Sequence, residues 1–217
     1  MCINNKLIIK KFGIIDYKDS WSAMQEFNAT RDDSTIDEIW LLQHSPVYTL
    51  GLAGKESHIL QQSSIPTIRT DRGGQITYHG PGQLIIYLLI NLKRKKLTVS
   101  QLISALENTI IGFLETLDCK AYANPNARGV YIDNKKIASI GLRVSKGCSY
   151  HGLSFNIDLD LKPFDNINPC GIKDLAMINL VNISKEFNIK NIVNIIIPHL
   201  TKQLQYDRIQ TFKVDYI

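Results

Sequence analysis

The stretch that decides the fold is Asp71–Tyr87, which reads DRGGQITYHGPGQLIIY. Glycine adopts backbone dihedral angles that other residues avoid, and it lets backbone N–H groups come close to a ligand. A dinucleotide-binding loop requires a helix directly after its glycines, and no helical pattern follows here. The Gly-Lys-Ser/Thr of a P-loop is also absent. We therefore expect a ligand other than a nucleotide to lie against Gly73-Gly74 and Gly80-Pro81-Gly82. A glycine-rich turn with a hydrogen-bonded histidine is the alternative.

The residues around this stretch predict a mixed sheet with helices. Gln83–Leu92 is nearly all apolar, which predicts a central strand covered on both faces. An amphipathic helix is predicted at Thr98–Leu117, with a capping box at its start. The other predicted strands are Asp37–Leu50 with an interruption at Pro46, Pro66–Thr70, Gln75–Tyr78, a hairpin over Gly129–Val144 that turns at Asp133-Asn134, and Tyr150–Ile157; the other predicted helices are Asp16–Arg31, a segment near Asp174–Phe187, and one near Asn191–Tyr206, broken or started at Pro198. The pattern predicts a single α/β (α+β) domain over residues 1–217, with a largely antiparallel sheet flanked by helices.

Composition limits the function classes. The 217 residues carry a net charge of +5, which permits an acidic partner without requiring nucleic acid. Proteins that bind single-stranded nucleic acid combine aromatic residues with basic ones, and this sequence does not alternate them in that way. No apolar run reaches the length of a membrane span, and the N-terminus does not read as a signal peptide. We expect a cytoplasmic protein with reduced cysteines, no membrane or nucleic-acid partner, and no metal.

Cys170 and Lys136 are candidates for chemistry. Cys170 lies between Pro169 and Gly171, on a turn where its thiol could be exposed. A thiol becomes a useful nucleophile when a cation or a base is near, and Lys136 and His79 are the candidates. Lys136 shares a strand face with apolar residues, so it is either a partly desolvated lysine that exchanges protons or a lysine that extends to water.

The strand Tyr150–Ile157 could form the wall of a cleft. His151, Leu153, Phe155 and Ile157 alternate with Gly152, Ser154 and Asn156. The first set is expected to be buried, and the small polar set would suit the wall of a narrow cleft. An ordinary amphipathic strand is the alternative.

Together these segments resemble the lipoyl(octanoyl) transferase family, the octanoyl-[acyl-carrier-protein]:protein N-octanoyltransferases. RGGQITYHGPGQL resembles the family signature. TRDDSTIDEIWLLQH, GVYIDNKKIASIGLRV, GCSYHGLSFNIDLDL and INPCG match its other blocks in the same order. The match covers roughly Tyr17–Ile172 and leaves the last segment of the chain without an assigned role.

The resemblance implies the fold of the biotin/lipoate protein ligase catalytic domain. It implies an acyltransferase that moves octanoyl from acyl carrier protein to a lysine of lipoyl domains, as in 2-oxoacid dehydrogenase complexes and the glycine cleavage H protein. Cys170 would carry the octanoyl group as a thioester, Lys136 would activate it, and His79 would assist or orient. The acyl site would comprise Arg72, Gly73, Gly74, Gln75, Ile76, Thr77, Tyr78, His79, Ser139, Ile140, Gly141, Gly152, Leu153 and Ser154. No ATP is expected, because exchange between two thioesters is nearly balanced. No metal is expected either, because Cys148 and His151 alone do not make a metal site.

Two rival functions stay open at this stage. An ATP-dependent lipoate or biotin ligase on the same fold would not need Cys170, and a non-catalytic carrier-binding module would need neither Cys170 nor Lys136. The basic run Lys93–Lys96 is either a solvated loop or a dock for acidic carrier proteins.

Overall fold

The computed structural model describes residues 5–215, which form two sheets and their covering helices. The strands are β1 (Lys6–Ile15), β2 (Asp37–His44), β3 (Val47–Leu50), β4 (Thr67–Arg69), β5 (Ile76–His79), β6 (Gln83–Leu89), β7 (Tyr122–Ala123), β8 (Gly129–Ile132), β9 (Lys135–Ser145), β10 (Cys148–Asn156) and β11 (Arg208–Lys213). The α-helices are α1 (Tyr17–Thr30), α2 (Leu92–Lys95), α3 (Val99–Glu115) and α4 (Ile189–Gln203). The larger sheet has the order β11-β1-β2-β6-β10-β9-β8-β7, and the smaller one has the order β4-β3-β5.

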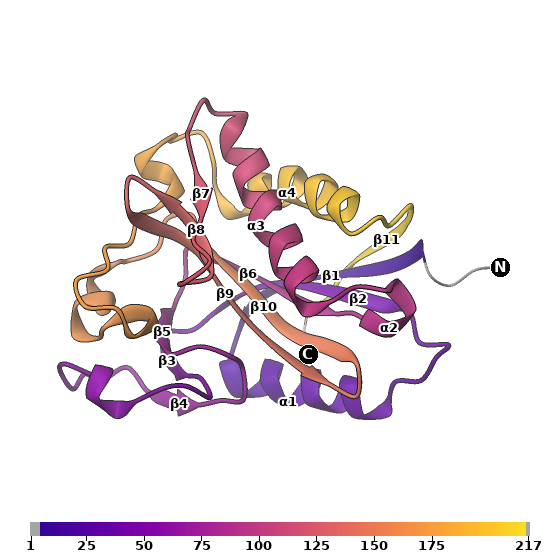
Figure 1. The fold of residues 1–217 in the computed structure, drawn as a ribbon, viewed down its shortest axis with the longest axis horizontal. Coiled ribbons are helices and arrows are strands. Elements are labelled where there is room, and N and C mark those ends of the chain that lie inside the picture. Colours follow the sequence, from indigo (N-terminus) through magenta and orange to yellow (C-terminus); the bar gives the residue numbers. More distant parts are fainter. Residues whose placement is uncertain (1–4, 216–217) are drawn as a thin grey trace.

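The central strand β6 is covered on both faces, as its sequence predicts. Leu84, Ile86 and Leu88 belong to one apolar core, together with α3 and α4. Ile85 and Tyr87 belong to a second core on the side of α1. Figure 1 shows α3 and α4 above the sheet and α1 below it. Period-two alternation therefore places the two halves of one apolar run in two different cores.

Most pairs in the sheet are antiparallel, so the predicted class is confirmed. The pairs β2–β6, β6–β10, β10–β9, β9–β8 and β8–β7 are antiparallel, whereas β1 pairs in parallel with both β2 and β11. The predicted hairpin turns at Asp133 and Asn134, whose φ angles of 47° and 64° suit a two-residue hairpin turn. The capping box at Thr98 and Gln101 is also confirmed.

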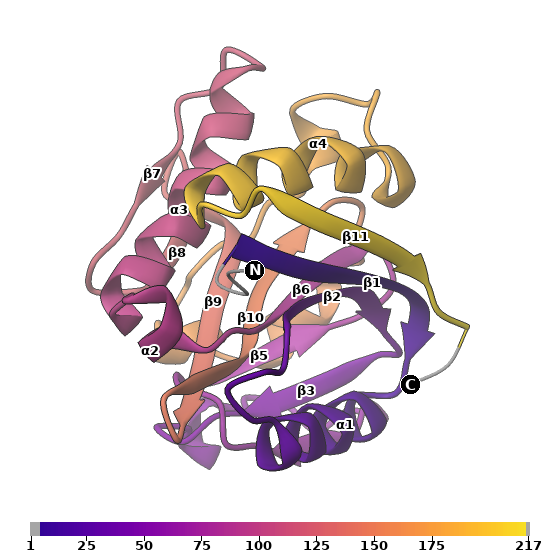
Figure 2. The same ribbon diagram turned by 90° about the vertical axis from the view of Figure 1, so that its right-hand side faces the viewer.

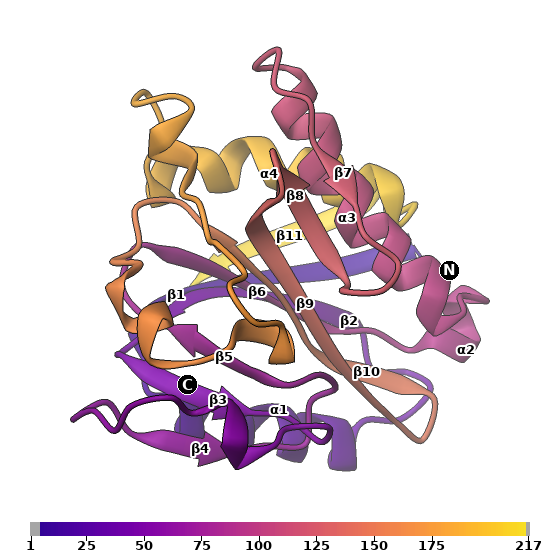
Figure 3. The same cartoon turned by 60° about the vertical axis from the view of Figure 1, so that its left-hand side comes forward.

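The predicted strand Asp37–Leu50 is divided between the two sheets. β2 lies in the larger sheet, and β3 lies in the smaller one. Proline cannot donate a hydrogen bond to a neighbouring strand, so Pro46 ends one ladder before the next begins. Figure 3 shows the small sheet beside α1 and below the long strands β9 and β10. The small sheet that follows this break forms one wall of the cavity described below.

The C-terminal predictions need correction. Residues 174–187 are largely irregular, with a single 3-10 turn at Leu180–Asn182 in place of a helix. Helix α4 is not broken at Pro198, which lies inside it on the exposed side, where water can satisfy the freed carbonyl. The edge strand β11 and its neighbour β1 were not predicted, and Figure 2 shows them side by side.

Candidate active site

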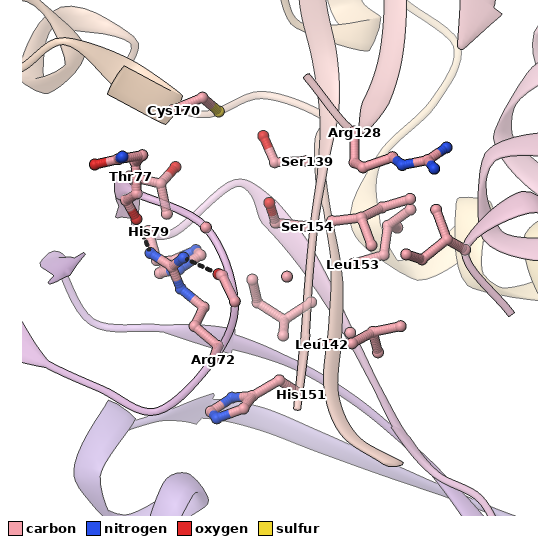
Figure 4. A pocket seen from close by; sticks show the side chains of 18 of the residues that line it. Arg72, Thr77, His79, Arg128, Ser139, Leu142, His151, Leu153, Ser154 and Cys170 are labelled. Carbon is pink, nitrogen blue, oxygen red and sulfur yellow. Dashed lines mark hydrogen bonds between the residues drawn. The ribbon is translucent and has the colours of Figure 1, made fainter. Parts of the chain in front are cut away.

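A cavity of about 500 Å³ lies where the small sheet meets β9 and β10. The acyl-site residues implied by the resemblance line it except Tyr78, and Cys170 lines it as well. The expected contact of the ligand with Gly80-Pro81-Gly82 is wrong, because this turn does not line the cavity, whereas Gly73-Gly74 does. Figure 4 shows Ser139 and Ser154 on the side of Thr77 and His79, whereas Leu142 and Leu153 lie on the side of Arg128. The cavity therefore extends to both sides of the paired strands β9 and β10.

Cys170 occupies a strained position on a tight turn. It lies in the 3-10 turn Pro169–Gly171, with φ 58° and ψ 14°, and it is half-buried. Left-handed backbone is uncommon for residues other than glycine and costs of order 1 kcal/mol or more. Gly171 follows with φ 74°, so the turn directs the thiol of Cys170 toward the cavity.

Lys136 contacts the sulfur of Cys170. Its Nζ lies 3.0 Å from Cys170 Sγ and 3.4 Å from the carbonyl oxygen of Ala127. The side chain is 1% exposed, and no salt bridge to a carboxylate is formed within residues 5–215. The Lys136 backbone is fixed by bonds from its N–H to Ala176 and from the N–H of Ile178 to its carbonyl. The sequence prediction that pairs Lys136 with Cys170 therefore matches the geometry.

His79 does not contact Cys170 or Lys136. Its Nδ1 lies 2.7 Å from Gln83 Oε1, and its Nε2 lies 3.2 Å from Thr49 Oγ1. Burial holds its pKa well below the usual value, and the positive charge of Arg72 acts in the same direction. His79 is thus a neutral ring, and both of its nitrogens are hydrogen-bonded to neighbouring side chains. This arrangement suits a histidine that positions the cavity wall better than one that transfers a proton to Cys170.

Arg72 organises the glycine loop from inside. Its guanidinium donates hydrogen bonds to the carbonyls of Thr49, Gly73 and Gln75 and to the hydroxyl of Thr49. Gly141 lies so close that an added Cβ would come within 3.1 Å of Arg72 Cδ and of the Gly73 carbonyl. Arg72 thereby closes one side of the cavity and fixes the loop against β9.

His151 lies at the end of the cavity opposite Cys170 and bonds to Asp71. His151 Nε2 lies 2.8 Å from Asp71 Oδ1, and Trp21 donates to the same carboxylate at 2.8 Å. Burial opposes ionisation of Asp71, but hydrogen bonds from His151 and Tyr150 hold its pKa below the usual value. Burial lowers the pKa of His151, although Asp71 opposes that shift.

Other lining residues were not predicted from sequence. These are Tyr17, Ile85, Tyr87, Val99, Ile103, Asn126, Ala127, Arg128, Leu142 and His151. The period-two alternation of side chains in Gln83–Leu92 places Ile85 and Tyr87 on the same face of the strand. The sequence does not indicate that this face borders a cavity. Asn156, expected in the cleft wall, is instead buried and accepts a hydrogen bond from Gln83.

The basic run Lys93–Lys96 is partly used by the fold. Arg94 donates to Asp37 at 2.6 Å and is 8% exposed at its side chain. The Nζ of Lys95 lies 4.0 Å from the ring centre of Tyr206. Docking through this run would therefore depend mainly on Lys93 and Lys96.

Within residues 5–215, no group of three or more His, Cys, Asp or Glu side chains could hold a metal ion. In the same part of the chain, no helix is long and apolar enough to cross a membrane.

Comparison with known proteins places the chain among acyl-transfer and ligase proteins. Residues 16–201 match the family of the lipoyl protein ligase A/B catalytic domain. The chain is 46% identical over 216 residues to an octanoyltransferase of Aliivibrio fischeri, covering 96% of each chain. It is 49% identical over 208 residues to an octanoyltransferase of Haemophilus influenzae, covering 94% of this chain and 98% of the relative. A solved lipoate-protein ligase A bound with ATP has a TM-score of 0.77 at 13% identity, covering 97% of this chain and 89% of that one, which supports the fold alone.

Proposed function

The chain belongs to the lipoyl protein ligase A/B catalytic-domain family, and we propose that it is an octanoyltransferase that carries the acyl group on Cys170. The distance of 3.0 Å between Lys136 Nζ and Cys170 Sγ is the observation that carries this proposal. A buried amine beside a half-buried thiol that lines the cavity provides both a nucleophile and a site for its proton. Identities of 46% and 49% to octanoyltransferases support the same assignment.

The first half-reaction transfers octanoyl from acyl carrier protein to the enzyme. The sulfur of Cys170 attacks the carbonyl carbon of the octanoyl thioester, and its proton moves to the amine of Lys136. The new carbon–sulfur bond forms as the bond to the carrier sulfur breaks, and the carrier leaves as a thiol with the proton from Lys136. One thioester replaces another, so this step needs no ATP.

The second half-reaction transfers octanoyl to a lysine amine of a lipoyl domain. The amine nitrogen attacks the carbonyl carbon on Cys170, the carbon–nitrogen bond forms, and the carbon–sulfur bond breaks. One amine proton passes through Lys136 to the sulfur of Cys170, which restores the free thiol. Proton transfer by a positioned side chain is worth about 10²–10⁴ in rate. We expect this reaction in the cytoplasm, where reducing conditions keep Cys170 available.

Two alternatives fit the geometry less well. A ligase that forms an acyl adenylate has no use for a thiol in contact with a buried lysine, and the solved ligase matches at 13% identity. A module that only binds carrier proteins would not retain a lysine that is 1% exposed against a strained cysteine. Burying an ionisable amine without a carboxylate partner is costly, which favours a chemical role.

The test is the intact-protein mass after incubation with octanoyl-acyl carrier protein without ATP. We expect a gain of one octanoyl group, mapped to Cys170 and discharged by a lipoyl domain. Cys170→Ser should abolish the adduct, whereas Cys119→Ser, at a half-buried thiol outside the cavity, should retain it. Transfer without any adduct would indicate direct attack in a ternary complex. Transfer that requires free octanoate and ATP would establish a ligase.

A further inference from the structure

We propose that His151, held by Asp71, forms the floor of the acyl slot and limits the acyl chain to about eight carbons. This inference rests on the proposed octanoyl transfer and adds the basis of its chain-length selectivity. The floor lies on the side of β9 and β10 that faces the small sheet, where the cavity is lined by Ser154, Ile85 and Tyr87. Figure 4 shows Cys170 at one end of this region and His151 at the other.

The strand register gives the length of the slot. Ser154 pairs with Ser139, and His151 pairs with Leu142, so the two levels are three residues apart along the hairpin. Three residues of antiparallel strand span about 10 Å. An extended eight-carbon chain spans about 9 Å, because each C–C bond of about 1.5 Å advances the zigzag by a little over 1.2 Å. An octanoyl group whose thioester end lies at the level of Ser154 therefore ends near His151.

Three of the large polar groups along the slot, those of Arg72, His79 and Tyr17, are already paired, so an apolar chain can pass them. The guanidinium of Arg72 is bound to Thr49, Gly73 and Gln75, and both nitrogens of His79 are occupied. Tyr17 lies 2.9 Å from the hydroxyl of Thr70. A paired polar group does not lose water on contact with an acyl chain, so its desolvation cost is small.

A floor that measures length must also be rigid, and the ring of His151 is clamped. Its Nε2 bonds to Asp71, and it is 1% exposed. The ring stacks on Tyr150 at 5.0 Å and on Tyr17 at 6.4 Å between centroids, with Tyr87 edge-on at 5.9 Å. Close-packed interiors resist displacement, so a longer chain cannot push this ring aside without breaking several contacts.

Two local costs at His151 also point to a role other than stability. Its φ is 58°, a left-handed conformation that is uncommon for histidine. Its Nδ1 is buried without a hydrogen-bond partner among the described residues. Strained backbone and unsatisfied polar atoms gather at functional positions. A ring that limits the length of the acyl chain would explain why the fold keeps these two unfavourable features at His151.

The experiment compares acyl chains of six, eight, ten and twelve carbons as carrier-protein thioesters, with formation of the Cys170 adduct followed by intact mass. The wild-type rate should fall steeply beyond eight carbons. His151→Asn keeps a residue that tolerates left-handed backbone and removes most of the ring. Because each buried methylene is worth roughly four-fold in binding, space for two more should raise the ratio of decanoyl to octanoyl rates by roughly fifteen-fold. His199→Asn, the same exchange on α4 and outside the cavity, should leave this ratio unchanged.

Each outcome decides the matter. If the wild-type protein forms the Cys170 adduct equally fast with acyl chains of eight to twelve carbons, the proposed role of His151 is wrong, whether or not the variant folds. A folded His151→Asn protein with an unchanged decanoyl-to-octanoyl ratio would overturn it too. In both cases the octanoyl adduct still forms, so the proposed function survives. If the wild-type protein forms no adduct with any chain, the proposed function fails and the floor fails with it.

Discussion

Acidification from pH 7 to pH 5 should destabilise the folded protein, because a histidine is buried in neutral form beside the cavity. Burial lowers the pKa of His44 from 6.5 to about 4, and its bond to the Ile15 carbonyl only partly opposes this. The ring lies 2.8 Å from that carbonyl and 2.6 Å from the hydroxyl of Tyr87. The unfolded chain binds a proton at this position below about pH 6.5, and the folded chain does so only near pH 4. Stability is therefore lost as pH falls through this window, and the loss levels off below it.

The size of the effect follows from the two pKa values. Between pH 7 and pH 5, a shift from 6.5 to about 4 removes about 2 kcal/mol from the free energy of unfolding. The pKa of His79 is lowered in the same direction, so it adds to the loss. The low pKa of Asp71 does not contribute here, because its stabilisation is lost only in more acidic solution. A small domain is stable by about 5–15 kcal/mol, so this loss is large enough to measure.

The assay is urea unfolding at constant ionic strength at pH 7, 6 and 5, followed by tryptophan fluorescence. His44→Gln keeps an acceptor for the Tyr87 hydroxyl but cannot titrate. The variant should be less stable at pH 7 and should lose about 2 kcal/mol less than the wild type on going to pH 5. Equal pH dependence in both proteins, or a wild type that is equally stable at pH 7 and pH 5, would refute the reasoning.

Three other substitutions test the site and its frame. Lys136→Arg keeps the charge but cannot take up a proton at neutral pH, so single-turnover acylation of Cys170 should slow by roughly 10²–10⁴, and an unchanged rate would exclude the proton-transfer role. Arg72→Lys loses most of the bonds to Thr49 and the glycine loop, so urea unfolding should show a loss of about 2 kcal/mol or more, and full stability would show that the loop holds itself. Gly152→Ala places a Cβ 2.0 Å from the Ile86 carbonyl and should cost about 3 kcal/mol or more in the same assay, whereas Gly13→Ala, with no atom within 4 Å, should be nearly neutral.

Local pattern was enough for the elements that carry strong periodicity. The stripe and capping box of α3, the apolar run of β6 and the turn at Asp133-Asn134 depend on neighbours in sequence, and all three are present. Residues 174–187, the edge strand β11 and its neighbour β1 were missed, because their conformation depends on distant partners. β11 is exposed along its whole length and exists only by pairing with β1, about two hundred residues earlier in the chain.

The sequence by itself determined the family and predicted the candidate site. A cysteine on a Pro/Gly turn, a lysine on an apolar strand face and a glycine-rich loop indicated candidate residues, and the order of motifs indicated the family. Tertiary structure alone decided which of these groups touch. Lys136 and Cys170 meet at 3.0 Å although they are 34 positions apart, whereas His79 bonds to Thr49 and Gln83. Side-chain contacts across a fold depend on register and turn geometry, which the residue types along one segment do not specify. For the same reason the sequence predicted His151 only as a buried residue of a strand. The fold places it at the end of the cavity.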